Sequence, residues 1–365
     1  MRMKAAVLYD PAQPLVVQEV DLAPPQRGEV LIRLVASGIC HSDVNIVRGE
    51  AAAPLPVVLG HEASGYIEEV GQDVTSLKVG DPVAVSLVRS CGHCFYCVRG
   101  APNDCEGAHP LASETRIHAL NGSPITQGIN VAGFAEYVVV DQSQVVRLPQ
   151  TMPLVTAAVL GCAVITGVGA VVNTARVQPG SSVVVMGMGG VGINAVQAAA
   201  LSGARRVIAV DVLDNKLAFA SQFGSTHTLN ASRENVMEAV QELTNGRGAD
   251  YVFVTVGSPR AVTDSLSLVR KQGAIILIGL IGDDGTVPLP VSRVVLNEFR
   301  ILGSFMGSSR ISQDIPQIVD LYQQGRLKLD ELITATYPIE SINQAIEAME
   351  RGEAIRNLIT FPSHN

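Results

Sequence analysis

The pattern of apolar and polar positions changes once along this chain, near Pro153. Before that residue, short β-rich runs alternate with glycine and proline, which is typical of strands joined by turns. The runs that we expect to form strands are residues 30–36, 65–70, 82–87 and 135–140. We therefore expect residues 1–150 to consist mainly of short strands and turns.

After residue 181 the pattern becomes a regular alternation of apolar strands with longer helical segments. The expected strands are residues 183–186, 207–210, 251–256 and 275–279. The expected helices are residues 192–201, 215–223, 236–243 and 262–269. Continuous apolar strands between helices indicate a parallel sheet that is covered on both faces. The predicted fold class is therefore α/β, with a doubly wound parallel sheet.

The last part of the chain follows this sheet with a helix, a strand, a second helix and a closing strand. We expect these elements at residues 315–324, 333–337, 341–351 and 356–361. A chain of 365 residues is too long for one core, which suggests two domains. Because the closing elements come after the sheet, they could return to complete the first domain.

Composition and charge narrow the class of protein. Hydrophobic residues make up 47% of the chain and charged residues 16%, as in a well-packed soluble protein. The formal charge of −8 argues against nucleic acid as a partner. Residues 148–175 and 177–204 carry no charge, but turns interrupt both stretches, so we expect buried core and no membrane span. The first ten residues lack the apolar core of a signal peptide, and we expect a cytoplasmic location.

Four of the six cysteines form a tight cluster, Cys91-x2-Cys94-x2-Cys97-x7-Cys105. Three disulfides would suit a secreted protein, but CxxC spacing in a chain of this size favours metal binding. Four thiolates complete the tetrahedron of a closed, structural zinc site, so His93 should lie outside it. Four other histidines have no partner that we can name, and we expect them at the surface: His109, His118, His227 and His364.

A glycine-rich turn, G-M-G-G-V-G, follows the first strand of the α/β part and precedes a helix. A bare G-x-G-x-x-G is weak evidence in a chain with 34 glycines, but this strand–helix context strengthens it. Its glycines permit a tight turn, close approach of a pyrophosphate to the backbone, and close packing of helix on strand. The helix N-terminus would then face the pyrophosphate. The predicted contacts of this Rossmann loop are Gly187, Gly189, Gly190, Val191 and Gly192.

Asp211 ends the next expected strand and indicates which dinucleotide binds. A carboxylate there accepts hydrogen bonds from the ribose hydroxyls of NAD and repels the additional phosphate of NADP. Arg205 and Arg206 precede that strand and are poorly placed to reverse this preference. Lys216, on the following helix, is a further candidate for the ribose. We therefore predict NAD as the cofactor.

Together these motifs resemble the zinc-dependent medium-chain alcohol dehydrogenases, of the liver-type, long-form branch. The resemblance rests on the Gly60-His61-Glu62 motif with its following glycines, the cysteine cluster, the Gly161-Cys162 pair and the later glycine loop. It implies a catalytic domain with a GroES-like β-barrel, interrupted in sequence by the Rossmann domain. The implied boundaries are residues 1–163 and 306–365 for the catalytic domain, about 88–110 for its zinc lobe, and 164–305 for the Rossmann domain.

The resemblance also implies a catalytic zinc, held by Cys40, His61 and Cys162 with one position left open. Glu62 is similar to an acidic residue that can approach the metal during ligand exchange. Asp43 is similar to a carboxylate that orients the histidine ligand. Zinc there would acidify a bound alcohol or polarise a carbonyl, while NAD carries the hydride. The expected cofactors are thus two zinc ions per chain and NAD.

The family also offers a path for the alcohol proton. Ser42 matches the hydroxyl that takes this proton and passes it to the ribose. Many relatives then use a histidine where this chain has Asn45, which cannot titrate, so we expect a water chain instead and no histidine-like step at about pH 6.5. His41 and Arg356 resemble contacts to the pyrophosphate.

The expected substrate is a hydrophobic primary or secondary alcohol, such as an aromatic one. By resemblance the pocket wall includes Leu87, Phe134 and Met306, all apolar. The length of the stretch between Cys105 and Phe134 matches the dimeric enzymes, so we expect a homodimer, with a homotetramer as the alternative.

Three other functions remain open. A glutathione-dependent formaldehyde dehydrogenase shares the zinc layout, but we find no convincing basic residue for the glutathione carboxylate near His109. A polyol dehydrogenase usually has a glutamate at the position of Cys162. A non-catalytic NAD-binding scaffold would have no need of an open zinc position.

Overall fold

The computed structural model describes residues 1–282 and 285–362, and His364 lies outside these residues. Within them the chain forms two compact units. Unit 1 comprises Met1–Ala163 and Arg310–Asn365, and unit 2 comprises Val164–Ser309. Unit 1 is thus interrupted in sequence by unit 2.

The second boundary lies after Ser309, whereas we expected it after residue 305. Two hydrogen bonds explain why residues 306–309 belong to unit 2. The Ser309 hydroxyl donates to the Ile165 carbonyl oxygen (3.4 Å), and the Asn173 side chain donates to the Gly307 carbonyl oxygen (3.3 Å). Both bonds attach this segment to helical residues at the start of unit 2.

Five strands of unit 1 close into a barrel in the order β1-β2-β7-β8-β4. Their bounds are β1 (Arg2–Leu8), β2 (Val16–Leu22), β4 (Val57–Val58), β7 (Ile117–His118) and β8 (Pro124–Gln127). Residues 5–8 of β1 are all fully buried, because β1 pairs with β2 on one side and with β4 on the other while core side chains cover it. A strand covered in this way has no alternation of polar and apolar residues.

The other strands of unit 1 form a sheet in the order β10-β6-β5-β3-β18-β17, with β9 also paired to β3. Their bounds are β3 (Glu29–Gly38), β5 (Glu62–Val70), β6 (Pro82–Val85), β9 (Tyr137–Asp141), β10 (Val145–Arg147), β17 (Ile333–Pro338) and β18 (Arg356–Thr360). β18 runs antiparallel to the end of β3, with Leu358 opposite Gly38. The tail of the chain therefore completes the sheet of the first unit, as we expected.

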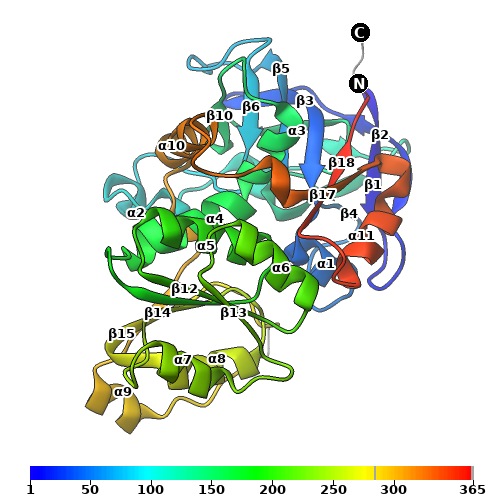
Figure 1. Ribbon diagram of the computed structural model, residues 1–365. Helices are drawn as coiled ribbons and strands as arrows, with labels where there is room; N and C mark the ends of the chain where they lie inside the picture. Colours follow the sequence, from blue (N-terminus) through cyan, green and yellow to red (C-terminus); the bar gives the residue numbers. More distant parts are fainter. Residues whose placement is uncertain (283–284, 363–365) are drawn as a thin grey trace. The chain divides into compact units, whose positions relative to one another are not determined.

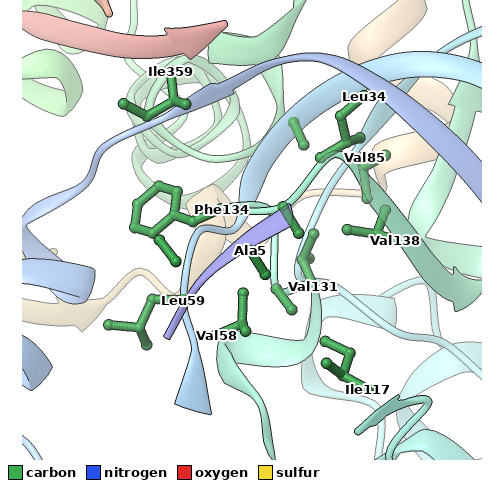
Figure 2. Close-up of a cluster of buried hydrophobic side chains, with 14 of the residues drawn as sticks. Ala5, Leu34, Val58, Leu59, Val85, Ile117, Val131, Phe134, Val138 and Ile359 are labelled. Carbon is green, nitrogen blue, oxygen red and sulfur yellow. The ribbon is translucent and has the colours of Figure 1, made fainter. Parts of the chain in front are cut away.

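One hydrophobic cluster fills unit 1 and includes side chains of both the barrel and the sheet (Figure 2). Phe134 is fully buried in it. A Cβ on Gly60 would lie 2.6 Å from the Phe134 ring, so only glycine leaves room for the ring there. The Phe134 amide also donates to the Leu59 carbonyl oxygen (2.8 Å). This packing fixes the backbone directly before His61.

Short helices connect these strands. The α-helices of unit 1 are α1 (His41–Val47), α2 (Phe95–Val98), α3 (Leu154–Ala157), α10 (Ile311–Gln323) and α11 (Ile342–Glu350). Single 3-10 turns also occur at η1 (Pro102–Asp104), η2 (Pro110–Ala112), η3 (Gly128–Asn130), η4 (Gln142–Gln144), η5 (Ala158–Gly161), η8 (Asp330–Leu332) and η9 (Ile339–Ser341). The helix that matters most for the site is α1, which begins directly after β3.

Unit 2 is a six-stranded parallel sheet in the order β13-β12-β11-β14-β15-β16. The bounds are β11 (Ser182–Met186), β12 (Arg206–Asp211), β13 (His227–Asn230), β14 (Ala249–Val254), β15 (Val269–Leu277) and β16 (Arg300–Gly303). This is the strand order of a Rossmann fold, which confirms the predicted fold class. Ligands of such sheets bind at the carboxyl ends of the strands where the order reverses, here between β11 and β14.

Helices cover both faces of this sheet, as the buried strands predicted. α5 and α6 lie on one face, and α7 and α8 lie on the other (Figure 1). The bounds are α4 (Ala163–Gly169), the π-helix η6 (Ala170–Ala175), α5 (Gly190–Leu201), α6 (Asp214–Gln222), α7 (Val236–Leu243), α8 (Pro259–Leu268), α9 (Val291–Asn297) and the 3-10 turn η7 (Met306–Ser308).

Across the residues that the structure describes, no single helix is long and apolar enough to cross a membrane. Two consecutive helical segments, Leu154–Gly161 and Ala163–Ala175, reach the length and apolar composition of a membrane span only when they are taken together, and the chain bends by 53° between them.

Candidate metal centres and dinucleotide loop

Four buried side chains of unit 1 converge on one point. A sulfur, nitrogen or oxygen atom of each lies within 4.8 Å of the others, and the four residues are Cys40, His61, Glu62 and Cys162. β3 and β5 bring the first three together, because Gly38 at the end of β3 pairs with Glu62 at the start of β5. Cys162 follows η5, where a Cβ on Gly161 would collide with the Val85 carbonyl oxygen.

His61 presents one ring nitrogen to this cluster and the other to Asp43. Its Nδ1 lies 3.2 Å from an Asp43 carboxylate oxygen, and both side chains are buried. Asp43 is held in turn by the backbone N–H groups of Gly60 (2.9 Å) and Cys40 (3.2 Å). Burial disfavours a charged imidazole, but the Asp43 carboxylate and the Cys40 sulfur together outweigh this effect and raise the pKa of His61. The same carboxylate would favour a metal cation on Nε2.

Glu62 is fully buried between the cysteines and Arg356. Burial raises the pKa of its carboxyl to about 8, against the opposing effect of the Arg356 guanidinium. Nη1 of Arg356 lies 3.3 Å from Glu62 Oε1 and donates to the Ile39 carbonyl oxygen (2.6 Å). We expected Arg356 to contact a pyrophosphate, which stays a prediction. The structure directs its guanidinium toward Glu62.

The donor set fits a zinc ion. His61 Nε2 and Glu62 Oε2 are buried without a hydrogen-bond partner in the part of the chain that is described, whereas Glu62 Oε1 has the Arg356 ion pair at 3.3 Å. Each such group costs about 1–3 kcal/mol when it is left without a partner. Two cysteine sulfurs face them, and the Cys162 thiol lowers the pKa of Cys40 through a hydrogen bond. Two sulfurs and one imidazole nitrogen could therefore hold a cation and leave one coordination position open.

Helix α1 carries the residues that we assigned to proton transfer. Ser42 is half-buried, and its Oγ lies 3.9 Å from the Cys40 sulfur. Asn45 lies on the same helix and is also half-buried. His41, the first residue of α1, is exposed. Asp43 is the residue of this group whose side chain enters the buried cluster.

The cysteine cluster forms a second donor set. The sulfurs of Cys91, Cys94, Cys97 and Cys105 all lie within 4.8 Å of one another. A Cβ on Gly107 would lie 2.6 Å from the Cys91 sulfur, so only glycine fits beside the cluster. Burial and the neighbouring sulfurs raise the pKa of Cys97 to about 12, so a cation is needed to keep all four as thiolates.

Backbone N–H groups point at these sulfurs. The Cys97 N–H lowers the pKa of Cys94 to about 6, and it donates to that sulfur from the first turn of α2 (3.5 Å). The Cys94 N–H donates to the Cys91 sulfur (3.3 Å). These bonds hold four sulfurs around one point, as a closed zinc site requires. His93 lies outside the set, with Nδ1 2.8 Å from the Cys91 carbonyl oxygen.

His109 differs from our expectation that it is a surface residue without a partner. Its Nε2 lies 3.7 Å from the Cys105 sulfur, and its Nδ1 lies 3.7 Å from an Asp141 carboxylate oxygen. Only 11% of the side chain is exposed. The signal in the sequence was its place shortly after the last cysteine of the cluster, but Asp141 comes from another strand.

The glycine loop of unit 2 has the conformation that its sequence predicted. Gly187 has φ +97°, and a Cβ on Gly192 would collide with the Gly187 carbonyl oxygen. Gly189 is the N-cap of α5 and has no side-chain cap, and a Cβ there would meet open space. The first turn of α5 therefore offers N–H groups and room for a pyrophosphate. Gly190 and Val191 form that first turn.

Asp211 ties this loop to the end of β12. One oxygen accepts from the Met188 N–H (2.6 Å), and the other accepts from Val212 (2.8 Å) and Leu213 (3.0 Å). Lys216 lies half-buried on α6, and no hydrogen bond or ion pair is found for it among the described residues.

Thr255 is a residue that the sequence did not single out. Its hydroxyl lies 2.9 Å from the Met186 carbonyl oxygen and 2.8 Å from that of Gly187, and thus holds the base of the glycine loop.

The expected pocket wall needs one correction. Phe134 lies in the hydrophobic core of unit 1, so we no longer assign it to the wall. Leu87 is partly buried against the same core. Met306 belongs to unit 2, where the Thr166 hydroxyl lies 3.6 Å from its sulfur.

Comparisons with known proteins agree with this geometry. A family model described as alcohol dehydrogenase GroES-like domain matches residues 26–150, and one described as zinc-binding dehydrogenase matches residues 190–324. An NDMA-dependent alcohol dehydrogenase of Amycolatopsis methanolica is 38% identical over 98% of this chain and 99% of its own length.

Two solved structures are similar over almost the whole chain. An alcohol dehydrogenase zinc-binding domain protein from Burkholderia ambifaria is 32% identical, with a TM-score of 0.94 over 99% of each chain. The benzyl alcohol dehydrogenase of Acinetobacter calcoaceticus is also 32% identical, with a TM-score of 0.93 over 99% of this chain and 100% of that chain.

Proposed function

Because this chain belongs to the zinc-dependent medium-chain alcohol dehydrogenase family and is an oxidoreductase, we propose that it transfers a hydride between an alcohol and NAD. The product is the corresponding aldehyde or ketone. The observation that carries this proposal is the buried set of two sulfurs and the unpartnered His61 Nε2. Three such ligands would leave a position of a bound zinc ion open for substrate, which a scaffold would not need.

The two proposed zinc sites have different roles, one catalytic and one structural. Cys40, His61 and Cys162 would hold the catalytic ion, and the cysteine cluster would hold the structural one. Zinc supplies Lewis acidity, which makes a bound hydroxyl more acidic or polarises a carbonyl. Asp43 fixes the ring of His61 through Nδ1 and leaves Nε2 for the metal. Glu62 stays close to this set as an acidic side chain that can approach the metal.

The proton leaves by a route without a titrating histidine. Ser42 would take the proton of the alcohol, and a ribose hydroxyl of bound NAD would accept it from Ser42. Asn45 can hydrogen-bond but cannot titrate, so a water chain carries the proton onward. We therefore expect no histidine-like step at about pH 6.5 in the pH profile of hydride transfer.

The glycine loop and Asp211 support NAD. Open N–H groups at the start of α5 suit the pyrophosphate, and the carboxylate at the end of β12 suits the ribose hydroxyls. His41 and Arg356 are the further candidates for the pyrophosphate, and Lys216 is the candidate for the ribose.

A hydrophobic, aromatic alcohol is the proposed substrate class. Support comes from the similarity to a benzyl alcohol dehydrogenase. A pocket of this kind discriminates weakly, because one methylene is worth only about 1–3 kcal/mol.

One experiment tests the metal and the reaction together. The purified chain is analysed for zinc and then assayed with aromatic, aliphatic and polyol substrates and with formaldehyde plus glutathione. Two zinc ions per chain and NADH formation from an aromatic alcohol are expected. Zinc in the cysteine cluster alone, with no turnover, would instead support a scaffold. Asp43→Asn should weaken zinc binding at the catalytic site about 10–100-fold, measured by competition with a chelator.

A second candidate function is alcohol oxidation that depends on NDMA. It follows from the relative whose name states NDMA dependence. The same panel is therefore run with NAD, with NADP and with NDMA added. Turnover with NAD alone supports the first candidate. Turnover that requires NDMA supports the second and would remove NAD as a freely exchanging acceptor.

A further inference from the structure

We propose that His109, held by Asp141, is a positioning residue of the cysteine cluster that stabilises the Cys105 thiolate and so retains the structural zinc. The inference rests on the zinc-binding part of the proposed function. It concerns a residue with no assigned role, and it extends the cluster from four sulfurs to a network that reaches the sheet of unit 1.

The Cys105 sulfur has several nitrogen atoms around it that can donate hydrogen bonds. It accepts from the backbone N–H groups of Cys91 (3.2 Å) and Gly107 (3.3 Å), and His109 Nε2 lies 3.7 Å away. In the described part of the chain, His109 is the only nitrogen-bearing side chain found bonded to a sulfur of the cluster. Four thiolates around a zinc ion leave a net negative charge, which N–H donors reduce.

Asp141 holds the other end of the ring. Its Oδ2 lies 3.7 Å from His109 Nδ1, while its Oδ1 accepts from the Ser143 N–H (2.8 Å) at the start of η4. The Asp141 carboxylate beside Nδ1 fixes the orientation of the ring, so that Nε2 faces the Cys105 sulfur. An N–H group at Nε2 would offset part of the negative charge of the cluster.

The segment of residues 141–144 also contacts the chain directly before the first cysteine of the cluster. The Ser90 N–H donates to the Ser143 hydroxyl (2.9 Å), directly before Cys91. Arg89 is buried nearby and bonds to Gln144 (2.9 Å) and to the Asn130 carbonyl oxygen (3.0 Å). Residues 141–144 thus hold the first cysteine through the backbone and the last one through His109. Removal of His109 should release only the second attachment.

The test compares variants of the whole, zinc-loaded protein. His109→Leu removes the donor, and His109→Gln keeps an N–H group that can reach a sulfur. Asp141→Asn removes the charge but keeps an oxygen for the Ser143 N–H. His93→Leu is the matched control, because His93 lies in the same lobe but bonds to a carbonyl oxygen. A His61→Ala background removes a ligand from the catalytic set, so that the zinc of the cluster is followed alone.

Two readouts are taken: the rate of zinc release to a chelator, and the thiolate-to-metal absorption band after cobalt substitution. His109→Leu should release zinc about 10–100-fold faster and shift the band. His109→Gln and Asp141→Asn should fall between it and the parent protein, and they carry the test if the leucine variant does not fold. His93→Leu should match the parent.

Two results would overturn the proposal. The first is a zinc-release rate and a cobalt absorption band in the His109 variants that equal those of the parent protein. The second is a change in His93→Leu as large as the change in His109→Leu. If the parent itself holds no zinc in the cluster, the zinc assignment fails, and that failure is visible before any variant is compared.

Discussion

Single side chains at strand ends carry much of the expected specificity, and Asp211 is the clearest case. Both of its oxygens accept backbone N–H groups, from Met188 on one side and from Val212 and Leu213 on the other. Asp211 therefore stabilises the conformation of the glycine loop, and it would also accept hydrogen bonds from the ribose hydroxyls. A test of its role in cofactor choice has to separate these two effects.

Asp211→Asn removes the charge with the smallest change in shape, because the amide keeps one oxygen acceptor, although its NH2 group must replace the other. We expect the preference for NAD over NADP to fall at least about tenfold, about 1.4 kcal/mol, since charged hydrogen bonds are the stronger ones. The measurement is kcat/KM with each cofactor. Asp214→Asn is the control, because Asp214 pairs with Arg233 at the surface (2.7 Å). An unchanged ratio in the Asp211 variant would remove this residue from its role.

Tyr322 makes stability depend on pH in the alkaline range. Burial and the Asp330 carboxylate, which accepts from its hydroxyl (2.9 Å), raise the pKa of Tyr322 to about 12. In the unfolded chain the phenol ionises at about pH 10. The contribution of this hydroxyl is therefore complete below about pH 10 and is lost between about pH 10 and 12.

We accordingly expect the parent protein to exceed Tyr322→Phe in stability by about 1 kcal/mol at pH 8. The difference should shrink as the pH rises toward 12, because only the parent gains ionisation on unfolding. Urea unfolding of both proteins across this range measures it. A difference that stays constant with pH would show that the hydroxyl is not perturbed in the folded state.

At the scale of elements, a buried ion pair joins β3 to the segment that enters β7. Arg116 donates to both carboxylate oxygens of Glu29, at 2.9 and 2.7 Å, and both residues are almost fully buried. The Gln26 N–H donates to the same carboxylate (3.0 Å). This pair thus connects the sheet of unit 1 to its barrel.

Glu29→Gln should cost up to about 3–5 kcal/mol of unfolding free energy, because it leaves the buried Arg116 charge with only the exposed Glu114 carboxylate (3.2 Å) as an anionic partner. Arg27→Gln is the matched control: its ion pair with Asp73 is exposed, and its loss should cost less than about 1 kcal/mol. Urea unfolding compares the two. Equal losses would mean that burial adds nothing to the Glu29 pair.

The elements also differ in how far the sequence could predict them. α7 occupies the expected residues, because its apolar positions repeat with a helical period and Asn235 caps it. β4 and β7 have two residues each, too few to show any period. The buried residues 5–8 of β1 show no alternation.

The candidate site divides in the same way. The cysteines, His61 and the glycine loop could be predicted, because residue type and local spacing identify them. The contact of His109 with Asp141 and that of Glu62 with Arg356 could not, because each depends on a strand from another part of the chain. Phe134 was misplaced because residue type alone does not distinguish a core side chain from a pocket wall.

At the scale of the whole molecule, unit 2 exposes several large apolar side chains in the segment that leads to the last strand of its sheet and in that strand. β16 is the last strand, and no further strand pairs with its outer side in the described residues. Large apolar side chains are exposed along this part of the chain: Leu280, Leu289, Val291, Val295, Leu296 and Ile301. Exposed large apolar side chains and an open strand edge are both features that an interface can cover.

We therefore predict a homodimer that forms through β16 and α9. The double variant Val295→Lys and Ile301→Lys places two charges on this surface and should shift the protein to a monomer, as measured by light scattering. Val98→Lys is the control, because Val98 is 68% exposed but lies in the cysteine lobe of unit 1. A tetramer that falls to dimers in the double variant would assign this edge to one of two interfaces. A parent protein that is monomeric, or a double variant that keeps its partners, would contradict the prediction.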